Sequence, residues 1–280
     1  MNFFVKNHRL TKGSSHVNLV ASPNVGGALS PKFLIVHYTA SGPDADIAGY
    51  FSQESASVSA HLVIRRDGSI SQCVPFNVQA WHAGKSQWTG KDGVHHIGLN
   101  GSAIGIEIEN WGALSRNGAG WVSWTGTAVD GSRVVEARHK FGTPQCGWEV
   151  FTAAQIDTAI AVGRALCSAY DIEDILGHDD IAPGRKLDPG PAWDMGTFRT
   201  RIKGEAANEG AVMVVRSPGG LNIRSGAGAS FPMVRPMALA DGTRVVLHEA
   251  SGKWRYVSVL DRSGQPDFSG WVHGDWLLEE

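Results

Sequence analysis

Histidine and aspartate side chains able to hold a metal ion stand at separated points of this 280-residue chain. His37 follows the apolar run FLIV, and His178 and Asp188 lie ten positions apart in the segment GHDDIAPGRKLDPG. Two imidazoles and a carboxylate, with one position left for water, form the ligand set of a catalytic zinc ion. The chain has 11 histidines, and a single histidine is more often a surface or hydrogen-bonded residue than a ligand. Spacing alone leaves both interpretations open.

Hydrophobic patterning predicts the elements that must carry these side chains. The apolar run at 33–36 predicts a strand that ends at His37, and the alternating residues 103–109 predict another strand. Residues 59–76 predict a β-hairpin that turns at Arg66-Asp67-Gly68. Helices are expected at 46–56, at 151–170 with Thr152 as the N-cap, and at 197–206.

The segment 177–190 is rich in glycine and proline, which predicts a loop with a defined path. We expect Gly177 to let the backbone turn, and the prolines at 183, 189 and 191 to stiffen the path. Such a loop would fix Asp188 relative to His178, as a preorganised site requires.

The composition limits the classes of function. Apolar residues make up 42% of the chain, which is enough for a globular core, and a net charge of −2 gives no reason to expect nucleic acid as a partner. No apolar run approaches the ~18 residues of a membrane span. Residues 1–20 lack the apolar core of a secretory signal, so we expect a chain made in the cytoplasm. The three cysteines are too few for a disulfide framework.

Five sequence blocks occur in a fixed order: FLIVHYTAS, SAHLVIRRDGSISQCVPF, AWHAG, AIGIEIEN and GHDDIAPGRKLDPGPAWDM. In this order they resemble the zinc-dependent N-acetylmuramoyl-L-alanine amidases of the AmpD type, relatives of peptidoglycan recognition proteins and phage lysozyme-amidases. The resemblance covers about residues 30–200, apart from 112–150. It implies an α/β amidase domain with a mixed central sheet flanked by helices.

The resemblance also implies a role for each residue that matches a motif position. It implies one zinc ion bound by His37, His178 and Asp188. Such an ion activates a water molecule and polarises the scissile carbonyl group. Glu107 would be the catalytic acid that moves the proton of this water to the leaving amine. Lys186 would place an ammonium group near the developing oxyanion.

Further residues of the matching blocks are assigned to the substrate groove or to structure. Trp81 and His82 are expected on the wall of the groove. Glu109 shares a strand face with Glu107, and it either supplies a second carboxylate or forms a structural salt bridge or hydrogen bond. We expect a structural role for His61, and exposure to solvent for His95, His96 and His139.

The segment 112–150 is longer than its counterpart in compact members of the family. Glycine, tryptophan and serine are frequent in it, which predicts a long excursion with a hairpin. If it is ordered, it builds one wall of the cleft and brings Trp121 or Trp124 to the glycan. If it is a mobile flap, it does not contact the substrate. The sequence leaves both interpretations open.

The chain beyond the linker predicts a different domain. Short apolar strands alternate there with turn residues, without a helical period, which is typical of a small all-β barrel. NIRSGAG, GTRVV and GWVH resemble bacterial SH3-like (SH3b) domains, which implies a module that binds the cell wall or only packs. Trp254, Tyr256 and Trp271 are candidates for its recognition surface. The predicted organisation is an amidase domain at 1–202, a linker at 203–210 and an SH3b domain at 211–280.

The leading hypothesis is a peptidoglycan hydrolase that cuts the amide bond between N-acetylmuramic acid and L-alanine. A recognition protein that binds muropeptide without cutting it is the rival from another class, and the complete set of ligands with Glu107 and Lys186 favours catalysis. A cytoplasmic amidase that recycles anhydro-muropeptides fits the missing signal, whereas an SH3b module fits the polymeric wall. An endolysin released by a holin, or an exported effector, would act on the wall in the periplasm or outside the cell.

Overall fold

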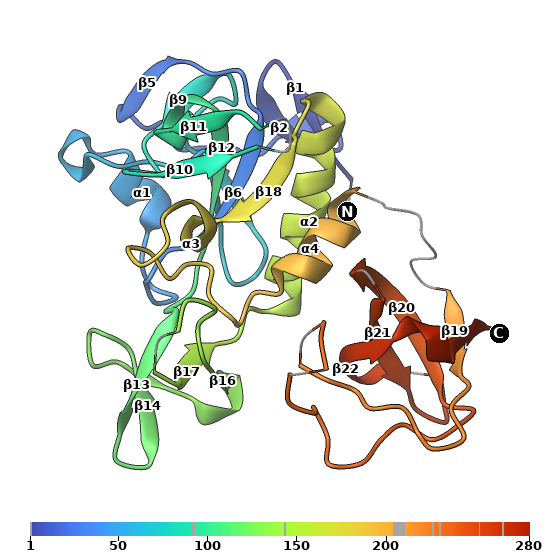
Figure 1. Ribbon diagram of the computed structural model, residues 1–280. Coiled ribbons are helices and arrows are strands. Elements are labelled where there is room, and N and C mark those ends of the chain that lie inside the picture. Colours follow the sequence, from blue (N-terminus) through green and yellow to red (C-terminus); the bar gives the residue numbers. More distant parts are fainter. Residues whose placement is uncertain are drawn as a thin grey trace. The chain divides into compact units, whose positions relative to one another are not determined.

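The computed structural model describes residues 2–90, 93–142, 144–203, 211–225, 227–229, 231–251, 253–264 and 266–280. The chain divides into two compact units, Met1–Met195 and Gly196–Glu280 (Figure 1). The predicted linker lies at 203–210, and all of it except Lys203 falls outside the described residues. No helix in the described part of the chain has the length and hydrophobicity needed to cross a membrane.

A mixed six-stranded sheet, in the order β18-β6-β12-β7-β8-β4, forms the centre of the first unit. β18, β6, β12 and β7 run parallel, β8 pairs antiparallel with β7, and β4 pairs parallel with β8. The strands are β4 Asn18–Leu19, β6 Phe33–Tyr38, β7 Leu62–Ile64, β8 Ile70–Gln72, β12 Ala103–Ile108 and β18 Asp174–Gly177. The predicted strands at 33–36 and 103–109 and the predicted hairpin are confirmed.

The central strand β6 explains why the sheet forms around it. Its side chains from Phe33 to Val36 are fully buried. A strand covered on both faces needs such a continuous apolar run, whereas a half-exposed strand alternates. The apolar run ends at His37, so the first polar side chain of the strand appears where β6 reaches its carboxyl end.

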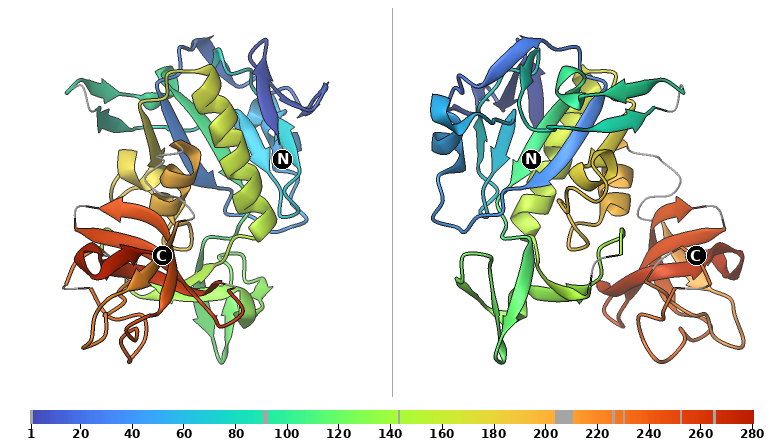
Figure 2. Two further views of the ribbon diagram at one scale, coloured as in Figure 1. Left: turned by 90° about the vertical axis from the view of Figure 1, so that its right-hand side faces the viewer. Right: turned by 60° about the vertical axis from the view of Figure 1, so that its left-hand side comes forward.

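Helices are few in the first unit. The longest, α2 (Ala153–Ala169), lies along one face of the sheet (Figures 1 and 2). It begins at the predicted N-cap: Thr152 Oγ1 accepts from the Gln155 N–H, and Gln155 Oε1 accepts from the Thr152 N–H. The other helices of this unit are α1 Ile47–Phe51 and α3 His178–Ile181, and α4 Met195–Lys203 begins at the boundary with the second unit. The unit is therefore richer in strands than the predicted sheet flanked by helices, and α3 lies where a loop was predicted.

Short strands outside the central sheet complete the amino-terminal part of this unit. They pair as a three-stranded sheet and two two-stranded sheets. Their bounds are β1 Phe3–Lys6, β2 Arg9–Lys12 and β3 Ser15–His16; β5 Val25–Ala28 with β9 Val78–Ala80; and β10 Gln87–Thr89 with β11 His95–Ile97.

The segment 112–150 is folded. It forms a five-stranded antiparallel sheet in the order β15-β14-β13-β17-β16. Leu114, Trp121 and Val129 form a small core of its own. The strands are β13 Ala113–Asn117, β14 Gly120–Val122, β15 Ala128–Val129, β16 Val134–Ala137 and β17 Cys146–Glu149.

The second unit carries an all-β region after α4. Five strands form one antiparallel sheet in the order β22-β21-β20-β19-β23. Its core consists of aliphatic side chains such as Val215, Ile223 and Val257. The strands are β19 Val212–Val215, β20 Arg244–Ser251, β21 Trp254–Leu260, β22 Pro266–His273 and β23 Leu277–Glu279.

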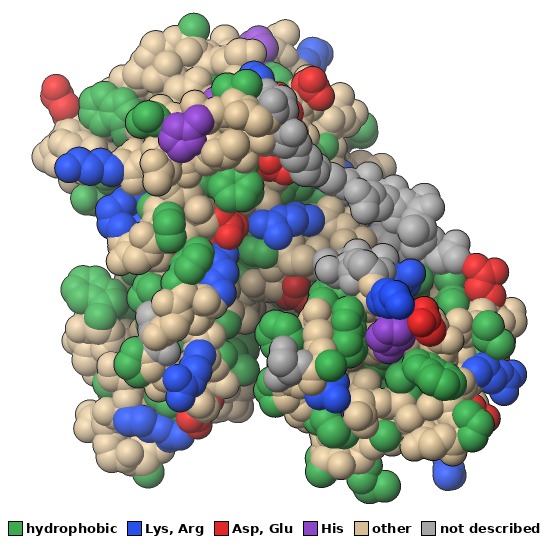
Figure 3. All heavy atoms as spheres, in the orientation of Figure 1, with side chains coloured by type: hydrophobic (Ala, Val, Ile, Leu, Met, Phe, Trp, Pro, Cys, Tyr) green, Lys and Arg blue, Asp and Glu red, His purple; other side chains and the backbone are tan. Residues whose placement is uncertain are grey.

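Charged side chains of both signs share the surface. On the face that Figure 3 shows, Lys and Arg side chains are interspersed with Asp and Glu. This distribution agrees with the net charge of −2. Because neighbouring charges of opposite sign partly cancel, the surface is not expected to attract a charged ligand over a long distance. Ligand binding is therefore expected to depend on local contacts.

Candidate metal centre

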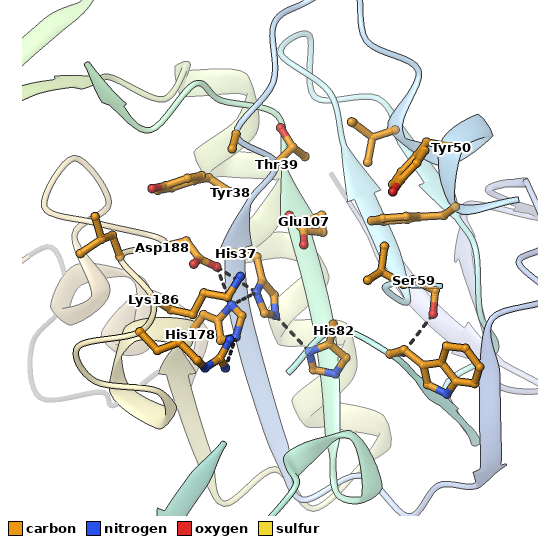
Figure 4. A pocket seen from close by; sticks show the side chains of 17 residues that line it. His37, Tyr38, Thr39, Tyr50, Ser59, His82, Glu107, His178, Lys186 and Asp188 are labelled. Carbon is orange, nitrogen blue, oxygen red and sulfur yellow. Dashed lines mark hydrogen bonds and ion pairs between the residues drawn. The ribbon is translucent and has the colours of Figure 1, made fainter. Parts of the chain in front are cut away.

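The carboxyl ends of three neighbouring strands bring the predicted site residues together. In the parallel ladders, Gly177 of β18 lies opposite Val36, and Glu107 of β12 lies opposite His37. His178 follows β18 directly as the first residue of α3. Because the carboxyl ends of parallel strands meet at one edge, these three side chains lie side by side, as Figure 4 shows.

A tight loop returns Asp188 to this edge. The backbone N–H of Asp179 donates to the carbonyl oxygen of Asp188 at 2.8 Å. A Cβ atom on Gly177 would lie 2.7 Å from Cδ of Pro189, which is closer than such atoms approach. We expected Gly177 to permit a turn, but its φ of −80° is open to any residue. The close approach of the two ends of the loop is the reason for the glycine.

Three potential ligand atoms converge at this point. His37 Nδ1 lies 2.9 Å from His178 Nδ1 and 3.0 Å from Asp188 Oδ2. His178 Nδ1 lies 2.9 Å from the same carboxylate oxygen. The three side chains are buried and form a group able to hold a metal ion.

The hydrogen bonds of His37 assign its tautomer. His82 Nε2 lies 3.2 Å from the carbonyl oxygen of Ala103, so this nitrogen carries the proton and donates. In a neutral imidazole the other nitrogen, His82 Nδ1, then accepts, and its partner at 3.0 Å is His37 Nε2. His37 therefore carries its proton on Nε2 and presents a lone pair on Nδ1 toward Asp188.

The same reasoning applies to His178. Its Nε2 lies 3.1 Å from the carbonyl oxygen of Ala83. The nearby Arg185 Nη2 donates to the carbonyl oxygens of Ala83 and Lys85, which uses both of its hydrogens. His178 Nε2 therefore donates to Ala83, and its Nδ1 also presents a lone pair.

Three electron-pair donors thus face one another without a proton between them. Such an arrangement is repulsive unless a cation lies among the donors. Two imidazole nitrogens and one carboxylate oxygen are ligands that zinc accepts, and they leave a position for water. The donor set at His37, His178 and Asp188 therefore fits a zinc ion.

Burial keeps His37 and His82 neutral. The pKa of His37 is lowered to about 4, first by burial and then by His178, although Asp188 opposes the shift. Burial also lowers the pKa of His82 well below its usual value, as does the neighbouring His37. Burial would raise the pKa of Asp188, but the adjacent imidazoles of His178 and His37 hold it well below the usual range. A neutral imidazole and an ionised carboxylate are the protonation states that bind metal.

Glu107 has a different environment. Its side chain lines the same cleft, and among the described residues no group lies within hydrogen-bonding distance of its buried Oε2 atom. Burial raises the pKa of Glu107 well above its usual value, the negative charge of Asp188 adds to this, and Lys186 opposes it. A carboxyl group with a raised pKa beside a candidate metal centre is suited to accept and then release a proton.

All seven predicted site residues line one cleft of about 470 Å³, shown in Figure 4. They are His37, Trp81, His82, Glu107, His178, Lys186 and Asp188. Their catalytic and binding roles stay predictions. The sequence analysis missed Tyr38, Tyr50 and Arg185, which also line the cleft. Tyr38 follows His37 and Arg185 precedes Lys186, so adjacency to selected residues was the signal available.

Trp81 and His82 occupy different depths of the cleft. The side chain of Trp81 is 40% exposed, and its backbone N–H donates to Ser59 Oγ at 2.9 Å. His82 is buried behind His37. A Cβ atom on Gly105 would lie only 2.5 Å from Cγ of His82, so the glycine makes room for this ring. Trp81 is therefore placed to contact a ligand, whereas His82 is placed to orient His37.

The remaining acidic and histidine side chains of the matching blocks have structural partners. Glu109 Oε2 accepts from the backbone N–H of Arg66 at 3.0 Å, which is the structural alternative expected for it. His61 is fully buried, accepts from the Gly105 N–H and lies 3.0 Å from the Val78 carbonyl oxygen. The structural role expected for His61 is therefore confirmed.

The expectation that His139 faces solvent was wrong. Its side chain is buried and lies 2.9 Å from Asp179 Oδ2. The neighbouring Lys140 donates to Asp179 and to Asp180 at 2.9 and 2.6 Å. The segment 112–150 is therefore anchored on α3, the helix that begins with His178.

The two tryptophans proposed for the cleft wall also differ. Trp121 is buried, and the Arg116 guanidinium lies 3.8 Å above its ring. Trp124 is 74% exposed, and its indole N–H donates to the carbonyl oxygen of Ala40 at 2.8 Å. Ala40 lines the cleft, whereas the lining residues themselves come from outside 112–150. The segment is ordered and reaches the rim of the cleft through Trp124.

Known proteins are similar in sequence to part of this chain. The chain is 38% identical over 150 residues to the 1,6-anhydro-N-acetylmuramyl-L-alanine amidase AmpD of Escherichia coli (strain K12), covering 53% of this chain and 60% of AmpD. It is 34% identical over 171 residues to the N-acetylmuramoyl-L-alanine amidase AmiD of the same organism, covering 58% of this chain and 50% of AmiD. The chain thus spans about half to two thirds of the length of these relatives.

Among solved structures, the chain is similar to a selenomethionine derivative of AmpD, with 28% identity and a TM-score of 0.49 over 71% of this chain and 99% of that one. The family model described as N-acetylmuramoyl-L-alanine amidase (Amidase_2) matches residues 27–191. That range holds β6, β12, β18 and all seven residues of the candidate site. Since the match extends over more than half of the chain, this protein belongs to the N-acetylmuramoyl-L-alanine amidase family.

Proposed function

We propose that this protein hydrolyses the amide bond between the lactyl group of N-acetylmuramic acid and L-alanine in peptidoglycan. One observation carries the proposal: the lone pairs of His37, His178 and Asp188 face one another beside Glu107, whose buried Oε2 has no partner among the described residues. A binding protein would gain nothing from this arrangement. A metal-assisted hydrolase needs both of its parts.

In this proposal His37, His178 and Asp188 hold one zinc ion. When bound, zinc supplies a Lewis acid for the scissile carbonyl group and lowers the pKa of water. His82 fixes the tautomer and the ring orientation of His37 through the hydrogen bond to His37 Nε2. Ala83 does the same for His178 through its carbonyl oxygen.

Glu107 and Lys186 perform the proton transfer and the charge stabilisation. The Glu107 carboxylate accepts a proton from the attacking water, and the raised pKa lets it deliver that proton to the leaving amine nitrogen. The water oxygen bonds to the carbonyl carbon as the C–N bond breaks. The Lys186 ammonium group, which lines the same cleft, stabilises the negative charge on the carbonyl oxygen. Trp81 supplies an apolar wall for the substrate.

The second unit supports the polymeric cell wall as the substrate. We propose that its all-β region is an SH3-like barrel that binds the wall. Val257 of β21 faces the core, so the alternate residues Trp254 and Tyr256 face the other side of the sheet. There Tyr256 lies 5.4 Å from Trp271 between ring centroids. The result is a half-buried row of aromatic rings, which suits a sugar or peptide ligand.

The chain would then act outside the cytoplasm, on the wall. The relative AmpD bears the name of an anhydro-muropeptide amidase, and a recycling enzyme would act on the same amide bond in small fragments. The two functions differ in the substrate that contains this bond.

The test combines metal content with product analysis. Purified protein and its Glu107→Gln variant are incubated with intact sacculi and, separately, with anhydro-muropeptides. We expect one zinc ion per chain in both proteins, and new L-alanine amino termini with intact glycan strands only from the wild type. Cleavage of fragments without release from sacculi would favour recycling. Muropeptide binding with no cleavage of either substrate would favour a recognition protein.

A further inference from the structure

A second pocket lies next to the cleft, on the other side of the loop that follows β6. It has a volume of about 370 Å³, which is within the range of small-ligand pockets (roughly 300 to 1,000 Å³). The loop residues 42–45 form one wall, and Trp111 with residues 127–130 of the segment 112–150 forms the other. Thr39 and Ala40 of the same loop line the cleft. The loop therefore separates two neighbouring cavities.

One turn of the segment 112–150 bridges the two cavities. Ser123 and Thr127 close it: the Ser123 N–H donates to the Thr127 carbonyl oxygen at 2.9 Å, and the Thr127 N–H donates to Ser123 Oγ at 3.1 Å. Inside the turn, the Gly126 N–H donates to the Ser123 carbonyl oxygen. Thr127 lines the second pocket, and Trp124 of the same turn binds Ala40 at the rim of the cleft.

The exposure of Trp124 has a geometric consequence. Its indole N–H is occupied by Ala40, so the ring is held in place while 74% of the side chain stays exposed. An apolar ring fixed in this way pays little conformational entropy when a ligand stacks on it. Aromatic faces of this kind suit the apolar C–H faces of sugars.

The charges of the second pocket disfavour an anionic ligand. Arg133 lines it but pairs with Glu149, which also pairs with Arg66. The exposed carboxylates of Asp44 and Asp130 also line the pocket, and Asp130 accepts a hydrogen bond from the Ser132 N–H. Carboxylates accept hydrogen bonds from sugar hydroxyl and acetamido groups, and they repel the free carboxylate of a stem peptide. The pocket therefore suits uncharged saccharide units better than a peptide.

We propose that Trp124 and this second pocket form a saccharide subsite that holds further hexosamine units of the glycan strand while the cleft holds the unit whose amide bond is cut. The subsite rests on the proposed amidase function and extends it, because it makes the enzyme prefer long strands to single-sugar fragments.

The experiment compares three substrates that present the same amide bond in the full-length protein. They are a muropeptide with one sugar, a glycan strand of several disaccharides with the same stem, and a one-sugar muropeptide with a longer, cross-linked peptide. For Trp124→Ala we expect kcat/KM on the strand to fall about three- to tenfold, and kcat/KM on both one-sugar substrates to stay within about twofold. Trp124→Phe should keep most of the activity on strands.

Ile97→Ala is the matched control, since Ile97 is 79% exposed on β11 of the same unit. It should change none of the three values, and any wall binding by the second unit affects all the variants alike. An equal loss on all substrates, or no loss on the strand, would overturn the subsite. A loss confined to the longer peptide would assign the pocket to the peptide instead.

Failure of the amidase function gives a different result. If the wild type cuts none of the substrates, that function is wrong, and the subsite is then tested by binding of peptide-free glycan strands. Weaker binding by Trp124→Ala than by Ile97→Ala would still support the subsite. Equal binding by the two variants would reject it.

Discussion

Two glutamates of the first unit, Glu149 and Glu107, differ in how many hydrogen-bond donors surround their carboxylates. Glu149 of β17 is 1% exposed and accepts hydrogen bonds on both oxygens. Glu107 of β12 is half-buried, and its buried Oε2 atom has no partner among the described residues. The chain thus surrounds one carboxylate with donors and leaves the other open.

The donors around Glu149 come from distant parts of the chain. Arg66 donates to both oxygens at 2.8 Å, Arg133 donates to Oε1, and the backbone N–H of Trp111 donates to Oε2 at 2.8 Å. This carboxylate joins the hairpin β7–β8 to the segment 112–150. A buried charge with so many donors holds the structure together, and it has no capacity left for chemistry.

Glu107 has the opposite properties. It faces Asp188 and Lys186 in a cleft, and its pKa is raised because burial disfavours its charged form. Leaving a buried polar atom without a partner costs stability, about 1–3 kcal/mol. The comparison teaches that a carboxylate with an unsatisfied oxygen beside converging lone pairs indicates a ligand site. A carboxylate with all its hydrogen bonds made indicates a structural contact between two parts of the chain.

The largest effect is expected at Glu107, whose carboxylate has an oxygen without a partner among the described residues. Glu107→Gln should lower kcat about 10²- to 10⁴-fold, because the amide cannot take up the proton of the attacking water. The midpoint of thermal unfolding should not fall, since the carboxyl group that is lost has an unsatisfied oxygen. Steady-state kinetics and thermal melts of the purified variant measure both. A Glu107→Gln variant that melts at a lower temperature and keeps a tenth of the wild-type activity would indicate a structural role for Glu107.

The next largest effect is expected at Glu149, whose carboxylate accepts hydrogen bonds on both oxygens. Glu149→Gln should lower the free energy of unfolding by about 3–5 kcal/mol, since it leaves the guanidinium of Arg66 without its counter-charge. Denaturant titration measures this change. The control is Glu136→Gln, which breaks an exposed ion pair with Arg116 and should cost about 0–1 kcal/mol. Similar losses of unfolding free energy in the two variants would contradict the structural role assigned to Glu149.

A pH titration extends the comparison to a buried neutral group. Burial lowers the pKa of His61 from 6.5 to about 4. Between pH 4 and pH 6.5 the unfolded chain binds a proton at His61 that the folded chain does not bind. The contribution of neutral His61 to the free energy of unfolding is therefore complete above pH 6.5 and is lost as the pH falls toward 4. The loss should approach about 3 kcal/mol.

The measurement is the free energy of unfolding of metal-free protein at several pH values. His61→Gln can accept from the Gly105 N–H and donate to Val78 without titrating, so its dependence on pH should be flatter than that of the wild type. Parallel curves for the two proteins would mean that His61 does not contribute to the acid sensitivity.

The smallest effect is expected at His82, which lies behind the proposed metal ligand His37. His82→Leu removes the acceptor that holds the proton of His37 on Nε2, and zinc affinity should fall about 10- to 100-fold. Competition with a chelator measures this affinity without any assay of activity. His82→Gln, which keeps an acceptor, should lose less. Equal losses in the two variants would indicate a packing effect.

Much of the site could be predicted from the sequence because its signals are local. His37 ends an apolar run, Glu107 lies in an alternating strand, and Asp188 follows His178 within a loop of glycines and prolines. Parallel strands align such ends at one edge, and the resemblance of five sequence blocks to a known family selected the residues that meet in the cleft.

The rest depends on pairs that are far apart in the chain. His82 lies 45 positions from His37, and Glu149 lies 83 positions from Arg66, so neither partnership leaves a local pattern. His139 stands in a polar stretch, and its burial follows from Asp179, 40 residues later.

The two tryptophans of the segment 112–150 illustrate the same limit. Trp121 lies on β14, and its side chain packs in the small core of the segment. Trp124 lies three residues later, in a turn. Glycine- and serine-rich sequence gave no period from which to tell them apart.

The base of the segment 112–150 has a further consequence. The chain leaves and returns at one ladder, where Ala113 pairs with Trp148 and the Glu149 N–H donates to the Gly112 carbonyl oxygen at 3.1 Å. The part of this excursion from β14 to β15 can be shortened, lengthened or exchanged without removing Glu149 or His139, which tie the segment to Arg66 and Asp179. The proposed reach along the glycan is then an attribute that evolution or a protein engineer can alter in this part of the chain without changing the residues of the candidate metal centre.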